Sequence, residues 1–258
     1  MHTQPIITVQ HLSKRYEKPV LNDISFEIAS GQIIGYLGPN GAGKSTTIKI
    51  MTGMLTDFAG EVRIMGQDVR KSPLEVKKHI GYISENALLY DTLTPVEYLR
   101  FIGLLHKMEP ARITRKSMEL LTIFDLHTKA NTRMTAFSKG MKQKVLLIAG
   151  LLHNPDIIFL DEPLSGLDAN AVILVKEILT KLAAEGKTLF YSSHIMDVVE
   201  KFAHRIMILH QGKIIADGTF AELQHREKSE SLEQIFTELT GNQTHQSQAG
   251  QFIDALRD

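Results

Sequence analysis

Three short runs of nearly continuous hydrophobic residues occur along the chain, at positions 33–37, 157–160 and 188–191. Runs of this kind are typical of strands in a parallel sheet that is covered on both faces. The segment 24–28 differs, because Ile24, Phe26 and Ile28 alternate with polar residues and predict a strand with one buried face. With a further short strand at 6–9, the pattern predicts a small antiparallel β lobe ahead of an α/β core with a parallel sheet.

Helical spacing of hydrophobic residues predicts three helices among these strands. The first should begin near Pro95, because Thr94, Pro95 and Glu97 have the layout of a capping box with proline at the first helical position. The second should cover residues 138–153, and the third should follow Asp168 and stop at Gly186. The expected core-facing positions are Val96, Leu99, Ile102 or Gly103 and Leu105 in the first helix, Met141, Val145, Ile148 and Leu152 in the second, and Ala171, Val175, Ile178 and Leu182 in the third.

Smaller elements are expected towards the C-terminus. Residues 205–217 have the pattern of a hairpin that turns at Gln211 and Gly212. Beyond residue 226 the composition becomes polar, and we interpret residues 226–258 as a C-terminal extension with a mobile tail. One short amphipathic helix is predicted in it from the spacing of Leu232, Ile235, Phe236 and Leu239.

The composition excludes several classes of protein. Of the 258 residues, 43% are hydrophobic and none is cysteine, so the chain can form a substantial core but no disulfide framework and no thiolate metal site. The 29 basic and 29 acidic residues balance, so we expect no nucleic-acid partner. The start of the chain lacks a signal-peptide pattern, and the apolar stretches are shorter than the roughly 20 residues that cross a bilayer. We therefore expect a cytoplasmic protein, with any membrane crossing made by another chain.

A glycine-rich segment follows the first hydrophobic run and precedes a stretch with helical propensity. It matches the pattern G-x-x-x-x-G-K-[ST], in which backbone N–H groups surround phosphate oxygens. In this pattern Lys44 supplies a cation for the β- and γ-phosphates, and Ser45 supplies a hydroxyl for Mg²⁺. The alternative is a glycine-rich turn with a solvated lysine, which the flanking strand and helix disfavour. The predicted nucleotide-binding residues are Gly38, Pro39, Asn40, Gly41, Ala42, Gly43, Lys44, Ser45 and Thr46.

Two carboxylates directly follow the second hydrophobic run, at the strand end where open α/β sheets bind ligands. Asp161 is the candidate oxygen ligand for Mg²⁺ beside Ser45. Glu162 is the candidate base that accepts a proton from water attacking the γ-phosphorus. The alternative is an acidic pair at a helix N-terminus that only favours the helix dipole, and Pro163 is compatible with it.

Further segments resemble the ATP-binding-cassette ATPases, in the family's order and over residues 1–225. Residues 138–141 resemble the signature motif, residues 165–168 the D-loop, and His194 the switch histidine. Tyr16 stands at the place of the family's adenine-stacking aromatic, although a lone tyrosine in a polar loop is otherwise a surface residue. The resemblance implies a P-loop NTPase core with a helical lobe near residues 90–155. It also implies an ATPase in which Lys44, Glu162 and His194 are catalytic.

Ser138 is a natural N-cap for the helix that follows it, so the backbone near Gly140 forms a site for an anion such as phosphate. An ordinary serine cap without a ligand is the alternative. The resemblance implies that Ser138 and Gly140 bind nucleotide held by a facing second ATP-binding subunit, in a homodimer. It implies further that the chain works at the cytoplasmic side of the membrane, where a transmembrane permease subunit selects the transported molecule.

Two motifs depart from the family's pattern. The signature LSGGQ is replaced by residues 137–141, FSKGM, which keep the serine and the second glycine. The glutamine of the Q-loop falls on Glu85, a substitution that resembles exporter-type cassettes for drugs, lipids or glycans. Glu85 is a further candidate ligand of Mg²⁺, with a solvated surface glutamate as the alternative.

Two other functions are compatible with a nucleotide-binding cassette. A soluble cassette of DNA repair or ribosome rescue would normally bring a coiled coil, zinc elements, a second cassette or a basic surface, and the sequence contains none of these. A regulator that binds nucleotide without turnover would not require Glu162 and His194. The sequence therefore favours the transporter ATPase.

Overall fold

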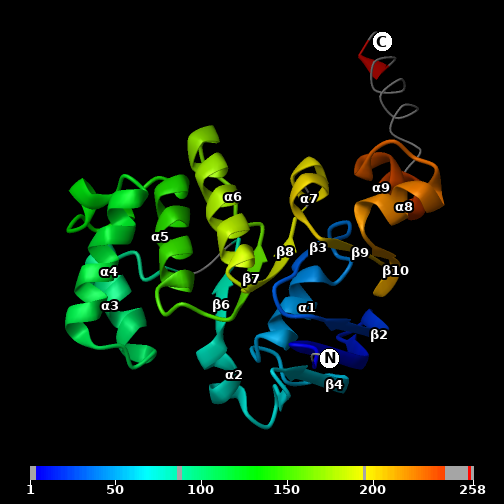
Figure 1. The fold of residues 1–258 in the computed structure, drawn as a ribbon, viewed down its shortest axis with the longest axis horizontal. Coiled ribbons are helices and arrows are strands. Elements are labelled where there is room, and N and C mark those ends of the chain that lie inside the picture. The colour runs from blue at the N-terminus through cyan, green and yellow to red at the C-terminus, as the bar shows by residue number, and fades with distance from the viewer. Residues whose placement is uncertain (1–3, 86–88, 194–195, 242–254, 257–258) are drawn as a thin grey trace.

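The computed structural model describes residues 4–85, 89–193, 196–241 and 255–256. Within these ranges the strands form a four-stranded and a six-stranded sheet, with helices around them (Figure 1). The α/β architecture, its antiparallel N-terminal lobe and its helical lobe confirm the predicted fold class.

The four-stranded sheet has the order β2-β1-β4-β5 and is antiparallel. Its strands are β1 (Ile7–Arg15), β2 (Pro19–Ile28), β4 (Ala59–Ile64) and β5 (Gln67–Asp68). Strand β1 is longer than its sequence predicts. Its register against β2 shifts between Val9 and Leu12 and again around Lys14, and such bulges interrupt the alternation of buried and exposed side chains.

The six-stranded sheet has the order β10-β9-β3-β8-β7-β6. Its strands are β3 (Ile33–Leu37), β6 (Ile80–Ile83), β7 (Ile157–Asp161), β8 (Thr188–Ser192), β9 (Arg205–His210) and β10 (Lys213–Gly218). The three predicted hydrophobic strands are β3, β8 and β7, which lie side by side, are parallel and are buried along their whole length. The antiparallel strand β10 follows the predicted hairpin turn at Gln211 and Gly212.

The described helices are α1 (Lys44–Met51), α2 (Pro73–His79), α3 (Pro95–Leu105), α4 (Pro110–Ile123), α5 (Lys139–Leu151), α6 (Ala169–Ala184), α7 (Met196–Phe202), α8 (Phe220–Glu227) and α9 (Leu232–Thr240). Helices α3, α4 and α5 form the helical lobe, drawn in green at the left of Figure 1. The predicted capping box of Thr94 and Glu97 is present at the start of α3. None of the helices in the described ranges has both the length and the apolar character that crossing a bilayer requires.

Some predicted core positions are wrong by part of a turn. Leu105 is 64% exposed, because α3 ends there and its buried face runs through Tyr98, Leu99 and Gly103. In α6 the fully buried positions continue at steps of four to Leu179 and Ala183, so Ile178 and Leu182 lie at the margin of the core. These shifts arise because the 3.6-residue helical repeat lies between three and four, so a sequence pattern can follow either step.

Two hydrophobic cores lie on the two faces of the six-stranded sheet. One joins this sheet to α1 and the antiparallel sheet, and Tyr36 and Phe190 lie at its centre with ring centroids 4.9 Å apart. The other joins the sheet to the helical lobe and to the C-terminal helices. The predicted helix of the C-terminal extension is α9, and it buries Leu232 and Ile235 in this second core. The predicted tail lies outside the described residues, except for positions 255–256.

Candidate functional site

The carboxyl ends of the parallel strands β3, β6, β7 and β8 meet at one edge of the sheet. The loop that follows β3, the residues after β6 and the residues at the ends of β7 and β8 therefore come together. A cavity of about 390 Å³ lies at this edge. It is lined by Gly38, Pro39, Asn40, Glu85, Glu162, Ser193, Met196 and Phe236.

The glycine-rich loop turns tightly into α1. Gly43 caps the helix with φ of 113°, and no side chain caps the first N–H groups of α1. A Cβ atom on Gly43 would lie 2.6 Å from Cδ2 of Leu21 and 2.9 Å from the carbonyl oxygen of Val20, so only glycine fits. The helix start, which has no acidic residue in its first turn, leaves backbone N–H groups for an anion.

Lys44 is the cation of this loop, and its side chain is buried. Its Nζ atom donates hydrogen bonds to the carbonyl oxygens of Gly38, at 2.6 Å, and Pro39, at 3.3 Å. Burial lowers the pKa of Lys44, and the nearby carboxylates of Glu162, Asp161 and Glu85 oppose that shift. The ammonium therefore lies within the field of the three predicted carboxylates, where it can also meet phosphate oxygens.

The two predicted carboxylates differ in their surroundings. Asp161 is the last residue of β7 and is 7% exposed, whereas Glu162 is partly exposed and lines the cavity. Glu162 has φ of 51°, and its N–H group donates to the carbonyl oxygen of Ser192 at 3.0 Å. Ser193 Oγ donates to Glu162 Oε2 at 3.3 Å. These bonds hold the Glu162 carboxylate towards the cavity, where it can accept a proton from water.

The oxygen donors of the site suit Mg²⁺. Ser45 lies exposed in the first turn of α1, and Asp161 and Glu85 provide carboxylates near Lys44. No group of three or more His, Cys, Asp or Glu side chains in the described ranges is arranged to hold a metal by itself. A hydroxyl and one or two carboxylates are what Mg²⁺ takes from a protein when phosphates and waters complete its shell.

The signature segment lies outside this cavity. Ser138 caps α5, accepting a hydrogen bond from the N–H group of Met141 at 3.2 Å, and it is exposed. Gly140 packs against the loop after Glu162, because a Cβ atom on it would lie 2.5 Å from the carbonyl oxygen of Gly166. Neither Ser138 nor Gly140 lines the cavity beside the glycine-rich loop.

Three side chains bind the signature helix to the loop after Glu162. Lys139 Nζ donates to Ser165 Oγ at 2.8 Å, and the buried Gln143 donates to the carbonyl oxygen of Pro163 at 3.0 Å. Lys144 forms an ion pair of 3.4 Å with Asp168. The segment that could bind a second phosphate is thus connected, within one chain, to the segment that carries Glu162.

Tyr16 lies at the turn of the hairpin between β1 and β2 and is 54% exposed. The same hairpin contacts the glycine-rich loop through Val20 and Leu21, as the packing around Gly43 shows. The structure therefore brings Tyr16 to the neighbourhood of the loop but not to the cavity at Glu162.

Three residues that line the cavity were not predicted: Ser193, Met196 and Phe236. Phe236 comes from α9, whose amphipathic pattern predicts the helix but not the surface that it covers. His194, the predicted switch histidine, lies outside the described residues.

Comparisons with known proteins agree with this geometry. A sequence profile of the ABC transporter family matches residues 21–165, which is more than half of the chain. The chain belongs to the ABC transporter family. As a member, it is an ATP-binding subunit with ATPase activity.

Two relatives illustrate the match within this family. The ABC transporter ATP-binding protein NatA of Bacillus subtilis (strain 168) is 35% identical over 237 residues, which cover 90% of this chain and 96% of NatA. The linearmycin resistance ATP-binding protein LnrL of the same organism is 33% identical, over 89% of this chain and 74% of LnrL.

Solved structures of ATP-binding cassettes are also similar to this chain. An ATP-binding subunit of an ABC transporter is 33% identical, with a TM-score of 0.86 and coverage of 91% of this chain and 99% of that chain. A dimeric ATP-binding cassette in a post-hydrolysis state bound to ADP and Pi is 24% identical and has a TM-score of 0.76, over 83% of this chain and 98% of that chain. At that identity the second similarity supports the fold alone.

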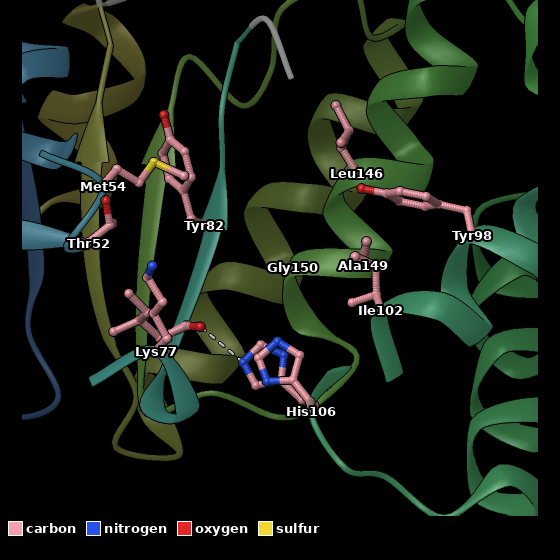
Figure 2. A pocket seen from close by; sticks show the side chains of 12 residues that line it. Thr52, Met54, Lys77, Tyr82, Tyr98, Ile102, His106, Leu146, Ala149 and Gly150 are labelled. Atoms are coloured by element: carbon pink, nitrogen blue, oxygen red, sulfur yellow. Dashed lines mark hydrogen bonds between the residues drawn. The ribbon is translucent and has the colours of Figure 1, made fainter. Parts of the chain in front are cut away.

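The ABC subunit also has a groove between the core and the helical lobe, with a volume of about 280 Å³ (Figure 2). Figure 2 shows Met54 and Tyr82 on one side of it, Tyr98 and Leu146 on the other, and His106 near its lower end. Met54 is 57% exposed, although it is hydrophobic. The lining combines apolar side chains such as Met54, Ile102 and Leu146 with the polar side chains of Thr52, Lys77, His106 and His153.

Two histidine rings stack at the end of this groove. The ring centroids of His106 and His153 are 3.6 Å apart, and the planes differ by 11°. His153 Nε2 donates to the carbonyl oxygen of Ile80 at 3.0 Å, while its Nδ1 atom is buried without a hydrogen-bond partner among the described residues. Burial, reinforced by the neighbouring His106, lowers the pKa of His153 from 6.5 to about 4. The stack is therefore neutral near pH 7.

This pair predicts a pH dependence of stability. Because the pKa of His153 is lower in the folded chain, the folded state binds fewer protons, and stability should fall as the pH drops from about 6.5 towards about 4. The substitution His153→Gln retains a donor for the carbonyl oxygen of Ile80 and should reduce the loss of melting temperature between pH 7 and pH 5. The exposed His127 is the control, and His127→Gln should leave the loss as in the wild type. Equal pH profiles for all three chains would contradict this prediction.

Proposed function

We propose that two copies of this chain bind two ATP molecules between them, and that closure and hydrolysis drive export through a separate permease subunit at the cytoplasmic side of the membrane. The position of the signature segment is the main observation that supports this two-copy arrangement. Ser138 and Gly140 are accessible at the start of α5 but lie outside their own chain's cavity, which Glu85 and Glu162 line. A facing copy would bring its γ-phosphate to them; the cassette bound to ADP and Pi, which shares this fold, is itself dimeric.

Each residue of the site in one copy would have a distinct role in binding or hydrolysing ATP. Tyr16 stacks on the base, and residues 38–46 surround the phosphates with their backbone N–H groups. Lys44 neutralises charge on the β- and γ-phosphates, while Glu162 accepts a proton from the attacking water. His194 is predicted to donate a hydrogen bond to the γ-phosphate. These roles follow the family resemblance together with the positions described above.

Mg²⁺ is the proposed cofactor, held by Ser45 and Asp161 with Glu85 near it. When bound, it supplies a positive charge that neutralises phosphate oxygens and fixes their positions. The protein contributes the hydroxyl of Ser45 and the buried carboxylate of Asp161, both from rigid elements. Glu85 adds a negative charge on the side of the attacking water.

Two observations support export as the direction of transport. Glu85, in place of the family's glutamine, resembles exporter-type cassettes. The relative LnrL is named for resistance to linearmycin, a function that export would provide. The transported molecule would be selected by the permease subunit.

The groove of Figure 2, which α3 and its C-cap line with Tyr98, Ile102 and His106, is the proposed docking site of the permease subunit. Its exposed Met54 and half-buried Ile102 offer apolar contacts. Because the groove joins the core to the lobe that carries Ser138, a docked segment would move with the closure of the two copies.

The substitution Glu162→Gln tests turnover. It removes the proton acceptor but keeps the shape of the side chain, so phosphate release should fall by about 10²–10⁴-fold while ATP still binds. The matched control is Glu177→Gln on the exposed face of α6, which should keep wild-type turnover. Equal phosphate release by wild type and Glu162→Gln would contradict the proposed base and favour a nucleotide-binding regulator.

A charged substitution in the groove tests whether the permease subunit docks there. Ile102→Glu places a carboxylate among the apolar lining residues and should abolish retention of the permease subunit that the wild-type chain binds in detergent-solubilised membranes. Leu105→Glu, three residues further on α3 at a 64% exposed position, should retain it. Retention of the permease by both variants would place docking elsewhere.

A further inference from the structure

Lys14 is a buried lysine near the end of β1, two residues before Tyr16. Its side chain is 4% exposed, and its Nζ atom donates to Oδ2 of Asp57 at 2.7 Å. The same Nζ atom lies over the ring of Tyr16, 4.7 Å from its centroid. One ammonium group thus contacts a carboxylate and an aromatic ring.

The ion pair with Asp57 offsets little of the free-energy cost of burying this lysine. Lysine is almost never fully buried, because removing an ammonium from water is costly. Asp57 is 94% exposed, so water screens its charge and the ion pair contributes little to the free energy of folding. The contact with the Tyr16 ring is the other interaction that the Lys14 ammonium makes within the described part of the chain.

The strand is deformed at this point. The register of β1 against β2 shifts between Leu12 and Lys14 and again between Lys14 and Arg15. Bulges of this kind redirect side chains and are frequent next to functional sites. Here the deformation accompanies a lysine that points inward while Tyr16 stays 54% exposed.

We propose that Lys14 is a positioning residue for the nucleotide base: it holds one face of the Tyr16 ring so that the base of ATP stacks on the opposite face. A cation attracts the negative face of an aromatic ring and so restrains the ring against rotation. It also withdraws electron density from the ring, which favours stacking by an electron-rich purine. The inference rests on the proposed function, which places Tyr16 against the base.

The position of Lys14 relative to the phosphate loop agrees with this role. Lys14 and Asp57 line a pocket of about 340 Å³ together with Leu21. Leu21 in turn packs against Gly43 of the glycine-rich loop. Lys14 therefore shares a pocket with Leu21, the residue through which the hairpin packs against the phosphate loop.

Binding of two ligands tests the inference. Lys14→Met keeps the length of the side chain but removes its charge, and it should weaken ATP binding by about 2- to 5-fold. Inorganic tripolyphosphate has no base, so its affinity for Lys14→Met should equal that for the wild type. Lys14→Arg retains a cation for the ring and should restore most of the ATP affinity. In turnover, Lys14→Met should raise KM more than it lowers kcat.

The control is Lys18→Met, which removes the same charge from an exposed position of the same hairpin. It should leave the affinity for both ligands at the wild-type value. Equal weakening of ATP and tripolyphosphate by Lys14→Met, or equal weakening by Lys18→Met, would show a general effect of charge and overturn the inference.

Tryptophan fluorescence gives a second readout, which would not change if Lys14 only stabilised the fold. The chain contains no tryptophan, so Tyr16→Trp introduces a single one at the proposed stacking position. ATP should quench its emission, and adding Lys14→Met should reduce that quenching at saturating ATP. Unchanged quenching would contradict a role for Lys14 in orienting the ring.

The outcomes separate this inference from the proposed function. If Tyr16→Ala binds ATP as the wild type does, base stacking at Tyr16 is wrong and the inference is wrong with it. If Tyr16→Ala weakens ATP binding while Lys14→Met does not, only the role of Lys14 is wrong.

Discussion

The parallel alignment of β3, β6, β7 and β8 is the constraint on which the site depends. Because these strands run in one direction, the segments that follow them meet at a single edge of the sheet. This edge places the buried ammonium of Lys44 within the field of three carboxylates, two at the end of β7 and one after β6. The combination suits Mg²⁺ with a phosphate chain, since the negative charges need a cation and the cation needs oxygen ligands beyond those of the protein.

The connection between the signature helix and the loop after Glu162 explains how binding at one site could act on the other. Lys139, Gln143 and Lys144 all contact residues 163–168, so three polar side chains link α5 to that loop. A phosphate held at Ser138 by a facing copy would pull on the same loop that positions the Glu162 carboxylate. Nucleotide binding, closure of two copies and activation of water would then be coupled through a few polar contacts.

Local sequence patterns were sufficient to predict the parallel strands, the phosphate loop and the carboxylates at the end of β7. Each of these features is one contiguous segment, so the pattern of its neighbouring residues is enough to identify it. Lys14 was not predicted, because the bulges in β1 that accompany its burial arise only where β1 pairs with β2, and a local pattern does not show that pairing. Phe236 was not predicted for the same reason: its pattern indicates a helix, but only the packed chain places that helix beside Glu162.

Mixing two inactive variants tests most directly whether each copy completes its neighbour's site. Lys44→Ala removes the phosphate cation of a chain's own loop, and Ser138→Arg obstructs the surface that it offers to a partner. A mixed pair contains one site with neither substitution, so phosphate release should return to about half of the wild-type rate per dimer. If mixed dimers are shown to form and still release no phosphate, the two-copy site is wrong.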